Sequence, residues 1–410
     1  MKKIIYLLVF VLFLFGCQSK HILDSDELKI VIASDIHYFL KEYYEECDWF
    51  EDNIAYGDGK MVTYADEILD AFQSKIEDIK PDFVILTGDL SFNGEKGSHE
   101  AFAKRLEILD NDGIHVLVIP GNHDVDNINA KGYGKDDFID VESVDAHEFK
   151  DIYKNLGYDL AYHQHKESLS YSVQVNEQYT FIMMDSTAHE LTGTSLDVGG
   201  YFTDSSYNWL ESELKDIQNQ GKKPVVVMHH NLAVHNEMLN NGYTIKDNEK
   251  IAELLNEYGV QFVLSGHIHC QSIQQINGIY DIASSSLLDA PLQYGIMTLN
   301  QSQMNYQTDS LTISLDSNDY FDMVSRNKFS SSFQVIEDEE VREDMLDVAI
   351  KANRYYFTGN IYKHIDELKS LPGYVYYDQE EGEKLSFYQS YLETMMKNTH
   401  DNQNLKLTIK

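Results

Sequence analysis

The chain alternates short apolar runs rich in β-branched residues with longer segments of helical periodicity, and this alternation constrains its fold more than any other feature. Short runs of this kind are typical of buried strands. The predicted strands are Leu28 to Ser34, Asp82 to Thr87, His115 to Pro120, Thr180 to Met184, Pro224 to Met228 and Val260 to Ser265. The predicted helices are Met61 to Ile79, Ser98 to Asp110, Ser205 to Gln218 and Asp247 to Tyr258. Strands that alternate with helices predict an α/β core with helices on the outside.

Polar clusters follow these runs at once, where open α/β sheets bind their ligands. Seven side chains that can donate to a metal lie in the clusters: Asp35, His37, Asp89, Asn122, His229, His267 and His269. Asp35 and His37 are two apart at a strand end, so both side chains should project to one side and could chelate one ion. His267 and His269 repeat that spacing. Seven donors suffice for two ions if one carboxylate bridges them, and two divalent ions roughly 3.5 to 4 Å apart serve in-line displacement at phosphorus.

The order of these motifs resembles the calcineurin-like metallophosphoesterase superfamily over roughly residues 28 to 300. The motifs are Asp-x-His, Gly-Asp, Gly-Asn-His-Asp, His and Gly-His-x-His. The resemblance implies a four-layer αββα sandwich of two sheets. It implies one metal held by Asp35, His37, Asp89 and His269. It implies a second metal held by Asp89, Asn122, His229 and His267, with Asp89 bridging. His123 falls on the family's catalytic histidine, a proton donor to the leaving oxygen.

The expected mechanism follows from the chemistry of two cations. A hydroxide held between them has a water pKa pulled toward neutrality and attacks phosphorus without a covalent enzyme intermediate. The unperturbed pKa of histidine, about 6.5, suits His123 for general-acid catalysis. Asp124 is the candidate for a carboxylate that orients His123, or else it only caps the following turn. His230 either contacts a substrate phosphate or is buried behind the site. The donor set suits two divalent metal ions, and Mn, Fe or Zn fit it equally well.

The segment Gly88 to Glu95 narrows the expected substrate. It lacks the arginine and the second aspartate of the Gly-Asp-x-x-Asp-Arg-Gly motif of phosphoprotein phosphatases, so Ser/Thr phosphatase activity is not expected. Three features together resemble bacterial class III cyclic-nucleotide phosphodiesterases: the segment Gly88 to Glu95, the segment Gly121 to Asp124 and the appended helical domain. The predicted activity is hydrolysis of a small-molecule phosphoester, most readily a phosphodiester. The alternatives are a phosphomonoesterase similar to 5′-nucleotidases, a non-catalytic surface binding protein, and a metal store.

The charge of the chain argues against one class of partner. The sequence has 32 basic and 68 acidic side chains, a formal net charge of −36. A protein with this excess repels polyanions over its whole surface. A nucleic-acid polymer is therefore not an expected partner. The oligomeric state stays open at this stage.

The N-terminus predicts an extracytoplasmic protein. Two lysines precede an apolar run from Ile4 to Phe15, which is shorter than the roughly 20 residues that span a bilayer and is typical of a secretory signal. The run ends in Leu-Phe-Gly-Cys and resembles the lipobox of bacterial lipoproteins, which implies that Cys17 is lipidated. Residues 1–17 would be the signal peptide and residues 18–27 a tether that anchors the protein to the membrane. The alternative is an ordinary signal peptide cleaved nearby, with Cys17 incidental.

The pattern changes after about residue 320, where apolar residues recur at helical spacing. One such stripe is Val341, Met345, Val348 and Ala352. We therefore predict a metallophosphoesterase domain over residues 28–316 and a mainly helical C-terminal domain over residues 337–410, with the boundary inside 317–336. Two stretches, residues 38–60 and 125–168, interrupt the strand–helix rhythm directly after chemical clusters. Long insertions beside a site are usually lids or specificity elements, and the alternative is that they only decorate the surface.

Overall fold

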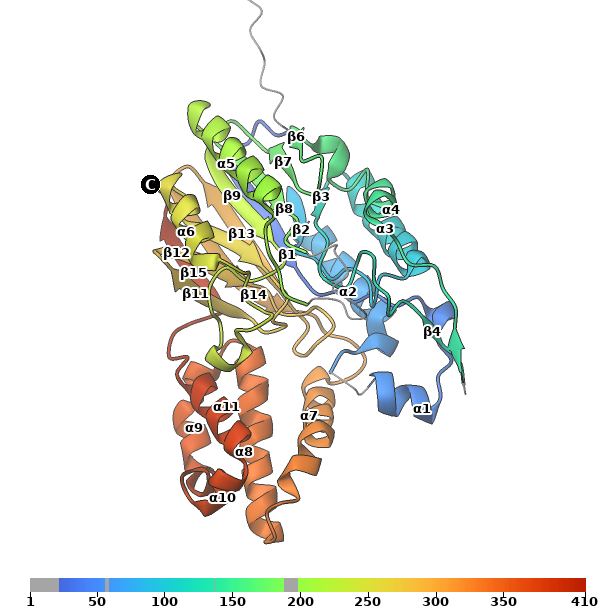
Figure 1. The fold of residues 1–410 in the computed structure, drawn as a ribbon, viewed down its shortest axis with the longest axis vertical. Helices are drawn as coiled ribbons and strands as arrows, with labels where there is room; N and C mark the ends of the chain where they lie inside the picture. Colours follow the sequence, from blue (N-terminus) through green and yellow to red (C-terminus); the bar gives the residue numbers. More distant parts are fainter. Residues whose placement is uncertain (1–21, 56–58, 136, 188–197) are drawn as a thin grey trace, which may run out of the picture.

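The computed structural model describes residues 22–410 apart from 56–58, 136 and 188–197 (Figure 1). The predicted signal peptide and Cys17 lie outside the described residues. The described end of the predicted tether is not free, because the backbone N–H groups of Ile22 and Leu23 donate to the carbonyls of Gln174 and Val175. The first strand begins at Glu27.

The first sheet has six strands in the order β15-β14-β13-β1-β2-β3. Its parallel half consists of β1 (Glu27–Ala33), β2 (Phe83–Leu86) and β3 (His115–Val118). Its antiparallel half consists of β13 (Gln293–Asn300), β14 (Gln303–Ser310) and β15 (Asn404–Thr408). The sheet therefore joins the first strand of the fold to the last strand of the chain.

The second sheet has seven strands in the order β11-β12-β10-β9-β8-β7-β6. Four central strands run parallel: β8 (Tyr179–Met184), β9 (Lys223–Met228), β10 (Phe262–Ser265) and β12 (Ile279–Ala283). The antiparallel edges are β6 (His163–Gln164), β7 (Tyr171–Gln174) and β11 (Ser272–Ile276).

The two sheets pack face to face. The rings of Phe83 on β2 and Phe181 on β8 lie 5.9 Å apart, and Tyr171 on β7 donates a hydrogen bond of 2.9 Å to the Val118 carbonyl on β3. Successive side chains of a strand point to opposite faces. Accordingly, Phe181 belongs to the core between the sheets, whereas Ile182 packs under the outer helices.

Helices cover both outer faces. On the first sheet lie α2 (Ala65–Ile79) and α3 (Lys96–Asn111), and on the second lie α5 (Asp204–Asn219) and α6 (Asn248–Glu257). Figure 1 shows these two pairs on opposite sides of the sheets. The predicted α/β fold class, a four-layer αββα sandwich, is confirmed, and each strand and helix predicted for it forms.

The two insertions pack against each other beside the sandwich. The first contains α1 (Asp48–Phe50) and turns at Lys41–Tyr43 and Glu51–Ala55. The second contains β4 (Gly132–Tyr133), β5 (Phe138–Ile139), α4 (Ala146–Ile152), a 3-10 turn at Tyr158–Leu160 and β6. Aromatic rings of the two insertions meet in one buried cluster, which also includes Phe92 from the loop after β2.

Five helices form a C-terminal region with its own apolar core (Figure 1). They are α7 (Ser317–Phe333), α8 (Glu339–Phe357), α9 (Ile365–Ser370), α10 (Glu380–Lys384) and α11 (Ser386–Met396). The expected boundary segment 317–336 is thus largely helical. The predicted helical range also ends differently, because β15 pairs with β14, with Leu407 opposite Met304. The chain leaves the first sheet after β14, builds the helices and returns to the same sheet.

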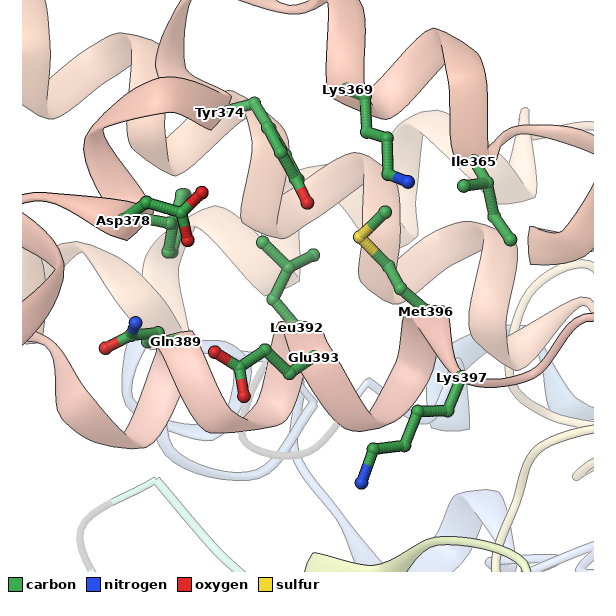
Figure 2. A pocket seen from close by; sticks show the side chains of 10 residues that line it. Ile365, Lys369, Tyr374, Asp378, Gln389, Leu392, Glu393, Met396 and Lys397 are labelled. Atoms are coloured by element: carbon green, nitrogen blue, oxygen red, sulfur yellow. The ribbon is translucent and has the colours of Figure 1, made fainter.

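A hollow of about 330 Å³ lies within this helical region. Figure 2 shows side chains of both charges around it, among them Lys369, Lys397, Asp378 and Glu393. All its lining residues come from the helical region, so it is separate from the strand ends that carry the metal donors. Among the described residues, no helix combines the length and the apolar character needed to cross a bilayer.

Candidate metal centre

The predicted donors meet at one edge of the sandwich. Asp35 follows β1 and Asp89 follows β2 in the first sheet, while His229 follows β9 and His267 follows β10 in the second. The loops of each sheet are joined by backbone hydrogen bonds, such as that from the Asp35 N–H to the Gly88 carbonyl at 3.0 Å. The His267 N–H donates to Asp35 Oδ2 at 2.9 Å and so joins the two sheets.

A first group of donors consists of Asp35, His37, Asp89 and His269, whose ligand atoms all lie within 4.8 Å of one another. The Nε2 atoms of His37 and His269 are 3.1 Å apart. Asp35 Oδ1 lies 3.3 Å from His269 Nε2, and Asp89 Oδ2 lies 3.8 Å from His37 Nε2. The four side chains therefore converge on one point.

A second group consists of Asp89, His229 and His267, again with ligand atoms within 4.8 Å of one another. Asp89 Oδ2 lies 3.3 Å from His229 Nε2, and Asn122 Oδ1 lies 3.1 Å from the same nitrogen. Asn122 thus adds an oxygen donor to this group. Asp89 belongs to both groups, as expected for a bridging carboxylate.

The two carboxylate oxygens of Asp89 make different contacts. Oδ1 accepts a hydrogen bond of 2.8 Å from the His123 backbone N–H, while Oδ2 faces His37 and His229. This arrangement requires a glycine at position 121. A Cβ there would lie 2.2 Å from Asp89 Oδ1 and 2.3 Å from the Asp89 backbone nitrogen, distances that no side chain can occupy.

The histidines are oriented by acceptors behind them. His229 Nδ1 donates to the Thr87 carbonyl at 2.8 Å, and His267 Nε2 donates to the Gly242 carbonyl at 2.9 Å. His269 Nδ1 lies 2.9 Å from the carboxylate of Asp289. Because a carbonyl can only accept, the proton of each ring is held on the far side and the other nitrogen is left for a cation.

Five of the donors have left-handed backbone conformations: Asp35, His37, Asp89, His267 and His269, with φ between 42° and 68°. Aspartate and histidine are enriched among non-glycine residues in this region, where most other side chains are disfavoured. The prediction attributed the two-apart spacing to alternation along a strand, and this reason was wrong. β1 ends at Ala33, so strained turns aim Asp35 and His37.

The buried carboxylates favour positive charge in this centre. Burial opposes ionisation of Asp89, but the charges of His229 and His123 outweigh it and hold the pKa of Asp89 well below its ordinary value. Burial likewise lowers the pKa of His229, yet Asp89 raises it to about 9. At His269, burial lowers the pKa, but Asp35 and Asp289 together outweigh it and raise the pKa to about 10. A bound cation would supply the charge that these protons otherwise carry.

Divalent cations fit this arrangement. Asp35 Oδ1, which faces the first group, is buried with no hydrogen-bond partner, although buried polar atoms are normally paired. Facing imidazole nitrogens and carboxylate oxygens make a mixed N/O set suited to first-row transition metals. The two overlapping groups match the two ligand sets implied by the family resemblance.

His123 faces the first group, but Asp124 does not orient it. The His123 ring lies edge-on to His37, with centroids 4.8 Å apart. Its Nδ1 lies 2.8 Å from the Phe92 carbonyl and 3.0 Å from Asn93 Oδ1. The predicted orienting role therefore falls to Phe92 and Asn93. Burial and the charge of Lys60 lower the pKa of His123, while the charge of Asp89 opposes them.

Asp124 instead ties two loops of the centre together. Its carboxylate accepts hydrogen bonds from the backbone N–H groups of Leu90, Ser91 and Gly121 at 2.8 to 3.0 Å. These loops carry Asp89 and Asn122, so Asp124 fixes the spacing between two donors. The alternative considered for this residue, a cap of the turn that follows it, differs from these contacts, because all three N–H groups precede Asp124 in the chain.

His230 lies behind the donors. Its Nδ1 is 2.9 Å from Ser186 Oγ, and its Nε2 donates to the Val198 carbonyl at 3.0 Å. Its ring packs against His267 with centroids 4.5 Å apart. With both ring nitrogens engaged, His230 supports the centre rather than contacting a substrate.

Sequence reasoning missed Asp289 and Asn93. Asp289 follows a strand, β12, that the apolar pattern did not reveal, so its position at a strand end was not visible. Asn93 lies inside the segment Gly88 to Glu95, where only the absent arginine and aspartate were considered. A side chain near a motif can support the site through a hydrogen bond alone. The spacing of residues along the sequence does not indicate such a bond.

Comparison with known proteins agrees with this geometry. A family model described as calcineurin-like phosphoesterase matches residues 28–271, more than half of the chain. A 3′,5′-cyclic-nucleotide phosphodiesterase of Nostoc sp. is 25% identical over 220 residues, covering 53% of this chain and 67% of that protein. A probable glycerophosphodiester phosphodiesterase of Arcobacter nitrofigilis is 27% identical over 210 residues, 50% of this chain and 63% of that protein. The chain thus spans less than two thirds of the second relative.

Among solved structures, a dimetal phosphatase from Danio rerio aligns with a TM-score of 0.49 at 12% sequence identity. The alignment covers 70% of this chain and 98% of that chain.

The substitution Asp89→Asn should weaken binding of Mn²⁺ at least about 100-fold, because the loss of an outer hydrogen-bond partner of a ligand already costs 10- to 100-fold in affinity. The amide keeps an oxygen that can accept from the His123 N–H, so the fold should persist. Calorimetric titration with Mn²⁺ and circular dichroism would measure the two effects. Asp112→Asn, the same change at an exposed site, is the control. Equal Mn²⁺ affinity in Asp89→Asn and wild type would contradict a bridging role.

Proposed function

The chain belongs to the calcineurin-like phosphoesterase family and is a metal-dependent phosphoester hydrolase, and from this premise we propose that it hydrolyses small-molecule phosphodiesters. In this proposal two divalent cations are held by the two donor groups, and His123 is the general acid. When bound, the cations polarise the phosphoryl group and lower the pKa of bound water.

The observation that carries the proposal is the position of Asp89 between the two groups. Its Oδ2 faces His37 of one group and His229 of the other, while its Oδ1 holds the His123 backbone. A single carboxylate therefore sets both the separation of the two donor groups and the location of His123. Positioning of this kind supplies much of the rate enhancement in phosphoryl transfer.

His123 acts on the leaving group. Its Nδ1 proton points to the Phe92 carbonyl, so Nε2 is the nitrogen left for a substrate oxygen. Protonated His123 donates the Nε2 proton to the leaving oxygen as its bond to phosphorus breaks. The neutral imidazole that results keeps its proton on Nδ1. General acids placed in this way contribute roughly 10²- to 10⁴-fold in rate.

Two features favour diesters over monoesters. The donor loops, residues 35–37, 88–95, 121–124, 229–231 and 266–270, contain no arginine or lysine. A dianionic monoester normally requires such groups beyond the metals. Both relatives described above carry phosphodiesterase names, one for cyclic nucleotides and one for glycerophosphodiesters. We propose cyclic nucleotides as the first substrates to test, with lipid-derived diesters second.

We expect the soluble form lacking residues 1–17, loaded with Mn²⁺, to prefer bis(p-nitrophenyl) phosphate over p-nitrophenyl phosphate by at least about tenfold in kcat/KM. The metals can neutralise the monoanionic diester, whereas the dianionic monoester would leave charge unpaired. Steady-state release of p-nitrophenol measures both. Preference for the monoester would transfer the assignment to a nucleotidase-like phosphatase, and hydrolysis of neither would refute the proposed function.

His123→Ala should retain metal but lower kcat by roughly 10²- to 10⁴-fold on a diester with a poor leaving group, because only such a group needs protonation. The loss of kcat should be smaller for a p-nitrophenyl ester, because its leaving group departs as the p-nitrophenolate anion. Comparing kcat for a methyl ester with kcat for a p-nitrophenyl ester separates the two effects. His147→Ala, at a side chain 83% exposed on α4, is the matched control. An unchanged kcat on the methyl ester would exclude His123 as general acid.

We further propose that the protein is a bacterial lipoprotein, anchored outside the cytoplasm through a diacylated Cys17. Two acyl chains suffice for stable anchoring where one gives only marginal binding. The full chain should incorporate radiolabelled palmitate in a bacterial host and enter the detergent phase on phase partitioning. Cys17→Ser should abolish both. Wild-type protein that stays unlabelled and in the aqueous phase would indicate an ordinary signal peptide instead.

A further inference from the structure

Asp281 on β12 is a buried carboxylate that belongs to neither donor group. Its Oδ2 accepts hydrogen bonds from the backbone N–H groups of Leu232 and Ala233, at 2.6 and 2.8 Å. Its Oδ1 accepts a hydrogen bond of 2.6 Å from the Ser265 hydroxyl. A carboxylate withdrawn from water is costly unless it is paired and hydrogen-bonded, and these bonds meet that requirement. They also tie the carboxylate to two loops of the second sheet.

These two loops carry the histidines of the second donor group. Leu232 and Ala233 follow His229 by three and four residues, and Ser265 precedes His267 by two. His229 and His267 are the two donors that the second sheet contributes to that group. One carboxylate therefore holds the backbone near both of them.

Asn231 joins the same two loops directly. Its Nδ2 donates to Ser265 Oγ and to the Gly266 carbonyl, both at 2.9 Å. The Gly266 N–H in turn donates to the His229 carbonyl at 3.0 Å. The Ser265 hydroxyl thus accepts from Asn231 while it donates to Asp281, so its orientation is fixed by both partners. The loops are linked through a continuous buried network that ends at Asp281.

His235 completes the surroundings of the carboxylate. Its Nε2 lies 3.1 Å from Asp281 Oδ2, and neither side chain is exposed. The His235 carbonyl accepts a hydrogen bond of 3.4 Å from the Tyr356 hydroxyl on α8. All three contacts of Oδ2 therefore come from one segment, residues 232–235, whereas Oδ1 holds the other loop through Ser265.

We propose that Asp281 is a positioning residue that sets the separation of His229 and His267, and through it the affinity of the second donor group for its cation. This inference rests on the proposed function, in which two cations are bound. In the second sheet, Asp281 would do what Asp124 does in the first, where it ties the loops of Asp89 and Asn122. Second-sphere groups that orient metal ligands tune metal affinity in this way.

The two donor groups should differ in their dependence on Asp281. In the first group, three of four donors follow strands of the first sheet, and only His269 follows β10. His269 is held separately, because its Nδ1 lies 2.9 Å from Asp289. In the second group, both histidines follow strands that Asp281 ties together. Loss of Asp281 should therefore weaken the second cation more than the first.

The test titrates the metal-free protein with Mn²⁺. Wild type, Asp281→Ala, Asp281→Asn and the control Glu213→Ala are compared by calorimetry and by electron paramagnetic resonance, which distinguishes a single Mn²⁺ from a coupled pair. Glu213 is a matched control, because its side chain is only 7% exposed and its partners, Ser172 Oγ at 2.7 Å and His163 Nδ1 at 2.8 Å, lie on β7 and β6. The unfolding temperature of each variant is measured in parallel.

We expect Asp281→Ala to bind its first Mn²⁺ with about wild-type affinity and its second about 10- to 100-fold more weakly, the range for a lost outer partner of a metal ligand. The coupled-pair signal should give way to that of single Mn²⁺. Asp281→Asn should retain part of the second affinity, because its amide oxygen can still accept from Leu232 and Ala233. Glu213→Ala should lower the unfolding temperature but bind both cations, so a loss of stability alone would not account for the result.

Two wild-type affinities in Asp281→Ala would overturn the proposal. Equal weakening of both cations would overturn it too, because Asp281 would then support the centre as a whole, and so would a wild type that binds only one Mn²⁺. If Asp281→Ala does not fold, Ser265→Ala removes the bond to Oδ1 alone and should weaken the second cation selectively; unchanged binding there would contradict the proposal. If wild type binds two Mn²⁺ but hydrolyses neither p-nitrophenyl ester, the proposed function fails, while the titrations still decide the role of Asp281.

Discussion

The carboxylate of Asp89 is the interaction on which the centre depends. It follows a strand of the first sheet, yet its Oδ2 lies 3.3 Å from a histidine that follows a strand of the second. Two sheets packed face to face bring their loops to one edge. A carboxylate that contacts donors from both sheets joins these loops into a single site. The close approach of Gly121 and the hydrogen bonds from Asp124 to neighbouring loops serve this carboxylate. The sandwich can be understood as the frame that holds Asp89 between two sets of histidines.

The loop after β10 joins this centre to the C-terminal helices. His267 and His269 turn toward the donors, while Ile268 and Cys270 are buried in the apolar core of the helical region. The Gln271 N–H donates to the Phe357 carbonyl at the end of α8, at 2.9 Å. The helices therefore pack behind the loop that carries the candidate donors His267 and His269. Because the chain returns to the first sheet through β15, this region is secured at both of its ends.

Six strands, the helices that cover the sheets and the seven candidate donors could be predicted from sequence because each has a local signature. The six strands are β1, β2, β3, β8, β9 and β10. Buried parallel strands are continuous apolar runs, and chemical clusters follow them directly. Strands β11 and β14 were not predicted, since the sequences SIQQI and QMNYQTDS carry glutamine, asparagine and serine in strands that are only half buried. The prediction that Asp124 orients His123 was also wrong. Adjacency in sequence does not determine where a carboxylate points. Asp289 reaches the centre only through its long-range contact with His269, for which one sequence holds no signal.

The left-handed turns at five of the donors affect how the protein would lose activity. Such conformations in residues other than glycine cost about 1–3 kcal/mol each and persist only where their surroundings enforce them. Asp35, His37, Asp89, His267 and His269 are all held in this way, at the rim of a sandwich whose central strands, such as β2 and β8, are buried on both faces. On warming or in mild denaturant, we expect these turns to leave their left-handed conformation first, because that change releases backbone strain. Inactivation would then precede melting of the sheets, and the temperature of half-activity would lie below that of unfolding.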